Sequence, residues 1–277
     1  MTSNARRFAA AFLVSLAIAM PARATNYSID LTDIWWAGQA EDGWGVTISQ
    51  QGSILFSTFF IYGSDRSARW FTAAMFPVAA PAGSSVWSGD MFRSTGAFYG
   101  QVPFTKDSPT KVGTVTMSFT TANNATLVYT IDGVQVTKQI VRQTFTGNNL
   151  AGVYTGGAVM DRSGCSNSAL NGIADVQGQL TITHNDPSVV MSIAFTDNSG
   201  TASNCTFRGA YVNSGRLGSI SGGTWSCVVG NTTVIQGTTF SMGNIDGQVN
   251  GLTSNFAGAD SNRCQYSGRF GGLRNPN

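Results

Sequence analysis

Hydrophobic and polar residues alternate along most of this chain in short runs with a period of two, which predicts β-strands rather than helices. Trp44, Val46 and Ile48 share one face of an early run, and Ser53 to Tyr62 is apolar on both faces, as expected of a well-buried strand. The first half contains eight such runs. They cover residues 44–48, 53–62, 69–76, 86–92, 97–104, 112–120, 126–131 and 134–145.

Short turns separate these runs, so each strand is expected to pair with the next. Asp132-Gly133 lies between two alternating runs, which is the strongest short-range indication of a hairpin. Successive antiparallel strands with short loops form a meander. A meander of eight strands avoids exposed edges best by closing into an up-and-down barrel, whose interior holds side chains or one small ligand.

The composition changes near Gly147, Asn148 and Asn149. Only Trp225 of the six tryptophans follows this point, whereas all four cysteines do. Eight further runs follow, at residues 150–160, 173–183, 189–196, 205–212, 217–228, 233–242, 248–256 and 264–271. We therefore predict an all-β fold of two consecutive antiparallel up-and-down barrels, lipocalin- or avidin-like, with a Trp-rich domain at 25–147 and a disulfide-containing domain at 148–277.

The first 24 residues have the organisation of a secretory signal peptide. Arg6 and Arg7 precede an uncharged apolar stretch from Phe8 to Met20, and Ala22-Arg-Ala24 fits the small-x-small cleavage rule. The apolar stretch is shorter than the roughly 20 residues of a membrane span. We expect cleavage after Ala24 and export to the periplasm or the cell exterior.

Loss of the leader brings the chain close to neutrality. Arg6, Arg7 and Arg23 are three of the 16 basic side chains, so 13 remain against 14 acidic ones. No run of Lys or Arg occurs, and a nucleic-acid partner is therefore not expected. Short strands with many Ser, Thr, Gln or Lys on the solvent face, and the non-strand ending Arg274-Asn-Pro-Asn277, also disfavour membrane insertion as a β-barrel. A protein partner cannot be specified.

Cys165, Cys205, Cys227 and Cys264 form an even set in an exported chain, which predicts two disulfides. A zinc site would need closer pairs such as C-x-x-C, and none occurs. A faint repeat with a shift of 59 residues aligns residues 173–213 with 232–272, and Cys205 with Cys264. This repeat, with a spacing of about 40 residues between cysteines, favours the pairs 165–205 and 227–264, although three pairings exist.

Few other residues offer chemistry. The one histidine, His184, adjoins an Asn185-Asp-Pro turn, and we expect its side chain to be exposed. No catalytic nucleophile, nucleotide-binding or metal-binding motif occurs. We therefore expect no metal, no cofactor and no enzymatic activity.

The stretch from Asp30 to Gly45 is the exception, because it combines carboxylates with three tryptophans. A glycosidase needs two carboxyls about 5–10 Å apart. The candidates for such a pair are Asp30, Asp33, Glu41 and Asp42, which lie close together in the sequence. A structural interpretation, in which Asp42-Gly43 is a turn and Trp36 and Trp44 close one barrel end, weighs more. The candidate ligand-binding residues are the aromatics and the glutamate of the first barrel: Trp35, Trp36, Glu41, Trp44, Trp70 and Trp87.

Three segments resemble a module of exported proteobacterial β-proteins: Asp33-Ile-Trp-Trp36, Glu41-Asp-Gly-Trp-Gly45 and the run from Gln51 to Phe60. The module has a W-W…E-x-G-W-G core followed by Q-G-x-x-[IL]-F-[AS]-T. Residues 124–145 are similar to its closing hairpin, and residues 217–227 and 264–274 are similar to segments of the same proteins. The family has no assigned activity, so the resemblance implies export and modular β-architecture and transfers no catalytic residue.

Three functional hypotheses follow. The leading one is a non-enzymatic exported protein that binds a glycan or a small apolar ligand through aromatics of the first barrel. The second is a structural or adhesion module in which the tryptophans form a core. The third and weakest is a glycosidase that uses Glu41 with an aspartate. Solvent exposure of Trp35, Trp36 and Trp44 separates the first two.

Overall fold

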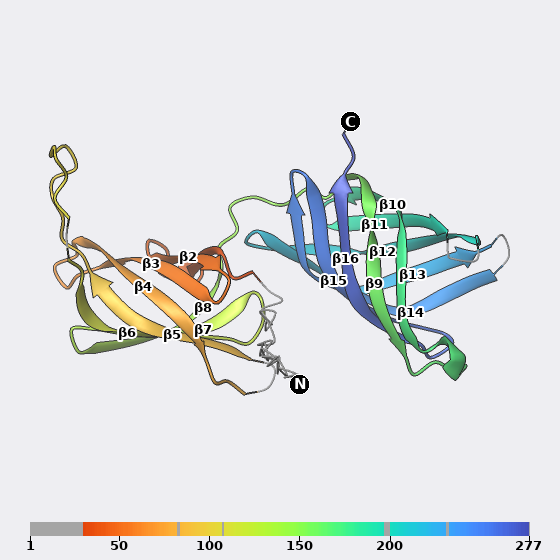
Figure 1. The fold of residues 1–277 in the computed structure, drawn as a ribbon, viewed down its shortest axis with the longest axis horizontal. Coiled ribbons are helices and arrows are strands. Elements are labelled where there is room, and N and C mark those ends of the chain that lie inside the picture. The colour runs from red at the N-terminus through yellow and green to blue at the C-terminus, as the bar shows by residue number, and fades with distance from the viewer. Residues whose placement is uncertain (1–29, 82–83, 107, 197–199, 231–232, 277) are drawn as a thin grey trace, which may run out of the picture.

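The computed structural model describes residues 30–81, 84–106, 108–196, 200–230 and 233–276 (Figure 1). The predicted signal peptide at residues 1–24 lies outside these ranges. Within them the chain forms two consecutive closed antiparallel barrels of eight strands each, which confirms the predicted fold class. Residues 143–151 connect the barrels, and the helical structure among the described residues consists of two 3₁₀ turns, η1 Gln39–Glu41 and η2 Ser168–Leu170.

The first barrel closes through a short strand in the tryptophan-rich stretch. Each strand pairs with the next, and β1 also pairs with β8, where Trp35 lies opposite Arg142. The strands are β1 Asp33–Trp36, β2 Gly45–Gln51, β3 Ile54–Tyr62, β4 Ala68–Val78, β5 Ser85–Arg93, β6 Thr110–Phe119, β7 Asn124–Ile131 and β8 Val134–Arg142.

One strand predicted for this barrel is wrong. The run at 97–104 lies in the connection between β5 and β6, and β1 supplies the eighth strand instead. Pro103 has no N–H to donate to a ladder. In addition, β5 pairs directly with β6, with Arg93 opposite Thr110, so the intervening run has no free edge beside it. This connection projects from the end of the first barrel that lies away from the second barrel (Figure 1).

Large side chains fill the interior of the first barrel. The Trp35 ring meets Phe119 edge-on at 5.3 Å between centroids, and its indole Nε1 donates to the backbone oxygen of Leu31 at 3.1 Å. A buried indole needs such an acceptor. The fully buried side chains include Trp35, Phe59, Met75, Trp87, Met117 and Leu127. The inward face of this barrel is therefore a packed core.

The second barrel has longer strands and closes between its first and last ones. Along this closure Gly156 lies opposite Gly272, and a Cβ added at Gly156 would sit 2.1 Å from the carbonyl oxygen of Gly271. Each of the eight predicted runs corresponds to one strand. They are β9 Gly152–Ser163, β10 Gly172–Asn185, β11 Ser188–Thr196, β12 Ala202–Ser214, β13 Leu217–Val229, β14 Thr233–Gln248, β15 Gly251–Asp260 and β16 Gln265–Arg274.

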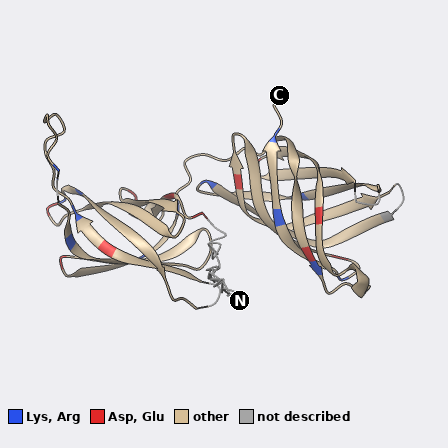
Figure 2. Cartoon of the chain, in the orientation of Figure 1, with Lys and Arg blue, Asp and Glu red and all other residues tan. Residues whose placement is uncertain are grey.

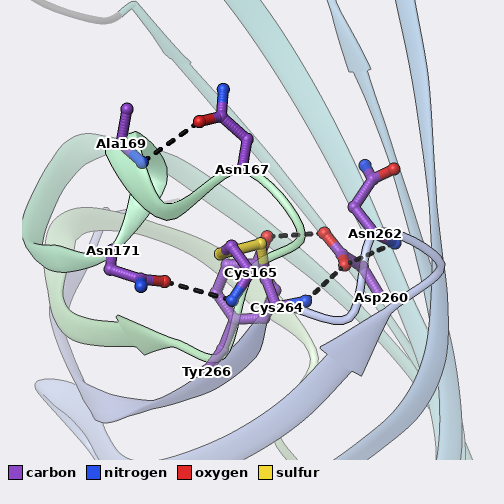
Figure 3. The surroundings of a disulfide bond; sticks show 8 residues. All are labelled: Cys165, Asn167, Ala169, Asn171, Asp260, Asn262, Cys264 and Tyr266. Carbon is purple, nitrogen blue, oxygen red and sulfur yellow. Dashed lines mark hydrogen bonds between the residues drawn. A yellow bond between two sulfur atoms is a disulfide. The ribbon is translucent and has the colours of Figure 1, made fainter.

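Two disulfides staple this barrel, but the favoured pairing of 165–205 and 227–264 is wrong. Cys205 joins Cys227 with a Cα–Cα distance of 4.0 Å, and Cys165 joins Cys264 at 3.9 Å (Figure 3). Cys205 and Cys227 lie directly opposite each other on β12 and β13. The other bond links the segment after β9 to the start of β16, the neighbour of β9 in the closed ring. Adjacency around the barrel therefore determines the pairing, and separation along the chain does not.

Candidate ligand-binding cavity

The interior of the second barrel contains a cavity of about 540 Å³. This volume lies within the range of roughly 300–1,000 Å³ that is typical of small-molecule sites. Small residues at inward positions, among them Ala158, Ala174 and Gly258, leave this space open. The wall is mostly apolar, and its aromatic hydrocarbon and indole side chains are Phe195, Phe207, Trp225, Phe240, Phe256 and Phe270.

The two ends of the cavity differ. The end nearer the first barrel is closed by buried side chains that do not line the cavity, among them Leu150, Tyr154, Tyr211 and Leu252. At the opposite end the lining includes Leu170 of η2, which is 41% exposed. Arg162, Phe195, Ser203 and Val229 also line the cavity there, each at or next to the end of its strand. The cavity therefore reaches the surface beside η2.

Most polar groups of the wall already have partners. The indole Nε1 of Trp225 donates to the backbone oxygens of Thr239 (3.0 Å) and Ala259 (3.2 Å). The hydroxyl of Tyr266 donates to Oδ2 of Asp260 at 2.8 Å. These groups stiffen the wall, but their hydrogens are not available to a ligand.

Asp260 is a buried carboxylate beside the mouth, with 4% of its surface exposed. It accepts hydrogen bonds from the backbone N–H groups of Asn262 (2.8 Å) and Cys264 (3.0 Å) as well as from Tyr266 (Figure 3). Burial raises the pKa of Tyr266, as does the hydrogen bond that its hydroxyl donates to the Asp260 carboxylate, so this side chain stays neutral. The arrangement fixes the Cys165–Cys264 corner of the barrel at the cavity mouth.

Arg162 is the exception among the polar wall residues. It lies directly opposite Tyr266 in the β9–β16 ladder and lines the mouth of the cavity. Its Nε atom is buried without a hydrogen-bond partner, and no ion pair involves its guanidinium among the described residues.

The structure does not bring the six candidate residues of the first barrel together. Trp35 and Trp87 have no exposed surface and belong to the core. Trp70 is 52% exposed on the outer face, opposite Phe60, and Trp36 is half-buried on the closing strand. These positions do not line a common cavity in the described part of the first barrel.

Trp44 and Glu41 form a separate cluster next to η1. The indole Nε1 of Trp44 donates to Oε2 of Glu41 at 3.1 Å, and Lys138 forms an ion pair with the same carboxylate. The Lys138 ammonium also lies 5.7 Å from the centre of the Trp44 ring. Glu41 thus fastens η1 to β8.

Asp30 and Asp33 take part in contacts between the barrels. Oδ2 of Asp33 accepts from the buried Arg142 guanidinium (2.9 Å) and from the backbone N–H of Arg216 (3.0 Å). The Arg216 guanidinium donates to Oδ2 of Asp30 at 3.0 Å and pairs with Asp246 of its own barrel. These carboxylates therefore link the first barrel to the β12–β13 turn of the second.

The electrostatics of Glu41 and Asp30 are unlike those of a glycosidase acid, whose pKa is raised. The hydrogen bond from Lys138 lowers the pKa of Glu41 and outweighs the opposing effect of desolvation. Burial would raise the pKa of Asp30, but the hydrogen bonds from Thr32 and the charge of Arg216 together lower it. Both groups are therefore held as anions in ion pairs.

His184 is not an exposed turn residue, so that expectation is wrong. Its side chain is 5% exposed and lies edge-on to Tyr211 at 5.1 Å. Its Nδ1 accepts a hydrogen bond from the backbone N–H of Leu150 at 3.1 Å. This contact fastens the connection between the barrels onto the closed end of the second barrel.

Charged residues are few and scattered over both barrels (Figure 2). In the described part of the chain, no group of three or more His, Cys, Asp or Glu side chains is arranged to hold a metal ion. No helix in that part is long and apolar enough to cross a membrane.

The cavity residues were missed at the sequence level, although a pattern pointed to them. The inward positions of the first barrel carry Met, Phe, Trp and Leu, whereas those of the second include Gly156, Ala158, Ala174, Gly178 and Ser203. Barrels of the same strand number leave an open interior when the inward side chains are small. Neither a protein-family model nor a curated protein matches this chain.

Proposed function

We propose that this protein is an exported carrier or sensor that binds a small apolar ligand inside its second barrel. The observation that carries the proposal is the cavity of about 540 Å³ with an apolar wall, open beside η2 and closed at the other end. Transfer of apolar ligand surface from water to such a wall is favourable by roughly 25 cal/mol per Å².

A glycan fits this wall poorly, because sugar hydroxyls need hydrogen-bond partners and the indole of Trp225 and the hydroxyl of Tyr266 are already committed. The first barrel has a different part in the proposal. Its packed interior, with Trp35 and Trp87 in the core, supports the structural role that the sequence offered as an alternative. Two disulfides and the leader-like residues 1–24 support export.

The test is a chain-length series of neutral primary alcohols, with binding followed by displacement of an uncharged environment-sensitive dye. Each added CH₂ group should contribute about 0.8 kcal/mol, which tightens Kd about fourfold until the cavity is full. The variant Ala158→Trp fills the cavity and should abolish binding. Ala194→Trp places the same ring on the exposed outer face of β11 and should leave binding unchanged.

Thermal unfolding of both variants controls for misfolding. Equal binding by the two tryptophan variants, or affinity that does not depend on chain length, would contradict a ligand site inside the barrel.

A further inference from the structure

Arg162 is out of place in an apolar cavity unless something pairs with it. Arginine is rarely buried without a partner, because an uncompensated charge loses its hydration. Two other arginines near barrel interiors have partners for their terminal nitrogens: Arg142 is bound to Asp33, and Arg274, whose Nε also lacks an acceptor, donates through Nη2 to the Tyr154 hydroxyl at 2.7 Å. Arg162 is half-buried, its Nε has no acceptor, and among the described residues no ion pair involves its terminal nitrogens. Arg162 lines the cavity at the end that also includes the partly exposed Leu170 of η2.

The acidic and polar neighbours of Arg162 do not neutralise it. Asp260 already accepts from three donors, one of which is the Tyr266 hydroxyl, and it makes no ion pair with Arg162. Asp175 borders the cavity from an exposed position and also makes no ion pair among the described residues. Since the Tyr266 and Trp225 hydrogens are committed, Arg162 is the charged donor left for a ligand.

The wall below Arg162 suits an elongated tail. Along β9 the lining runs from Arg162 through Met160 to Ala158, and along β16 it runs from Tyr266 to Phe270. Four residues of strand span about 13 Å. The lining thus places one cation at the mouth and apolar side chains over the whole depth below it.

We propose that the ligand is a single-chain amphiphile whose carboxylate pairs with Arg162 at the mouth and whose hydrocarbon tail fills the cavity. This inference rests on the proposed function and names its ligand class. Arginine presents its N–H donors in a planar fork that matches a carboxylate with two parallel hydrogen bonds. The bound head group would supply the acceptors that Arg162 lacks.

The test compares dodecanoate with dodecanol, which share a tail and differ in the head group. Wild-type protein should bind dodecanoate about 10- to 100-fold more tightly, as expected for charge-assisted hydrogen bonds. Arg162→Met should abolish this preference and leave dodecanol affinity unchanged. Arg162→Lys should keep part of the preference, because it keeps the charge and loses the fork. Arg269→Met, on the exposed outer face of β16, is the matched control and should behave as wild type.

A second measurement needs no variant. The carboxyl carbon of labelled dodecanoate is titrated by NMR in complex with the wild-type protein. A guanidinium partner lowers the pKa of the bound carboxyl below its value in buffer, whereas an apolar site without a partner raises it. A raised pKa overturns the inference even if Arg162→Met fails to fold.

The outcomes separate the two proposals. Equal wild-type affinity for dodecanoate and dodecanol overturns the role of Arg162 and leaves the apolar cavity as a binding site. A preference for dodecanoate over dodecanol that persists in Arg162→Met likewise overturns the role of Arg162 and leaves the apolar cavity as a binding site. Failure of the wild-type protein to bind either compound overturns the proposed function, and the head-group inference with it.

Discussion

Arg142 is the side chain whose loss should damage the first barrel most. Its side chain has no exposed surface, and the ring of Trp35 lies 4.8 Å from the guanidinium carbon. It donates to Oδ2 of Asp33 and to the backbone oxygens of Ala122 (2.8 Å) and Thr32 (3.2 Å). It therefore fastens β8 to β1 at the seam that closes the barrel.

The substitution Arg142→Met keeps much of the apolar stem and removes the charge and all these donors. Breaking a buried ion pair from one side costs about 3–5 kcal/mol, because the partner is left uncompensated. Asp33 is 12% exposed and keeps the hydrogen bond from the Arg216 backbone, which places the expected cost near 3 kcal/mol. With a urea dependence of about 1–3 kcal/mol per M, the unfolding midpoint should fall by about 1–3 M.

Urea unfolding followed by tryptophan fluorescence measures this directly, because five of the six tryptophans precede residue 148. Arg69→Met is the control: its ion pair with Asp65 is exposed on both sides and should be worth less than about 1 kcal/mol. The double variant Asp33→Asn/Arg142→Met should lose less stability than the sum of the single losses. A midpoint for Arg142→Met equal to that of Arg69→Met would refute the claim that this buried pair closes the barrel.

The other predictions concern β9, the disulfides and η1. Gly156→Ala should lower the thermal midpoint of unfolding, because the added Cβ meets the Gly271 carbonyl. Gly243→Ala, with nothing within 4 Å of the added Cβ, is the control and should leave the midpoint unchanged. Equal midpoints for the two variants would contradict the close approach of Gly156 to Gly271. Loss of the Cys165–Cys264 bond should lower the free energy of unfolding by about 5 kcal/mol and loss of the Cys205–Cys227 bond by about 3, because the two bonds close loops with sequence separations of 99 and 22. Urea denaturation of the two double-serine variants measures both losses. Glu41→Gln should match wild type in acid and be less stable above about pH 5. The pKa of Glu41 in the folded protein lies below its ordinary value of 4.5, so the ion pair with Lys138 stabilises the folded state above pH 4.5. This stabilisation is lost as the pH falls through the folded pKa. A stability difference between Glu41→Gln and wild type that does not change between pH 3 and pH 7 would contradict this assignment.

The fold class could be predicted because period-two alternation and short turns leave few topologies for sixteen consecutive strands. The strand at Asp33–Trp36 was harder to predict, because only four residues pair and their partners come from β2 and β8. The run at 97–104 has strand-forming residues, but Pro103 and the absence of a free edge exclude it. The local pattern therefore predicts that a segment is able to form a strand, but whether it has a pairing partner depends on the order of strands around the closed barrel.

The disulfide pairing also depends on the order of strands around the closed barrel. The shift of 59 residues maps β10, β11 and β12 onto β14, β15 and β16, and so Cys205 onto Cys264. Each of these cysteines bonds to the strand or segment that comes next around the barrel: Cys205 to β13 and Cys264 to the segment after β9. The repeat was compatible with the observed pairs. The predicted pairing was wrong because it judged proximity by separation along the sequence, by which Cys165 and Cys264 are far apart.

The placement of the cavity also explains how two barrels coexist without obstructing a ligand. Arg216, in the β12–β13 turn, binds Asp30 and Asp33 of the first barrel, and Leu150 of the connection is buried in the second. These contacts all lie at the closed end of the cavity, whereas Arg162 and η2 lie at the other. The tryptophan-rich stretch that attracted a catalytic interpretation thus supplies the seam of one barrel and its attachment to the next, at the end of the second barrel that lies away from Arg162 and η2.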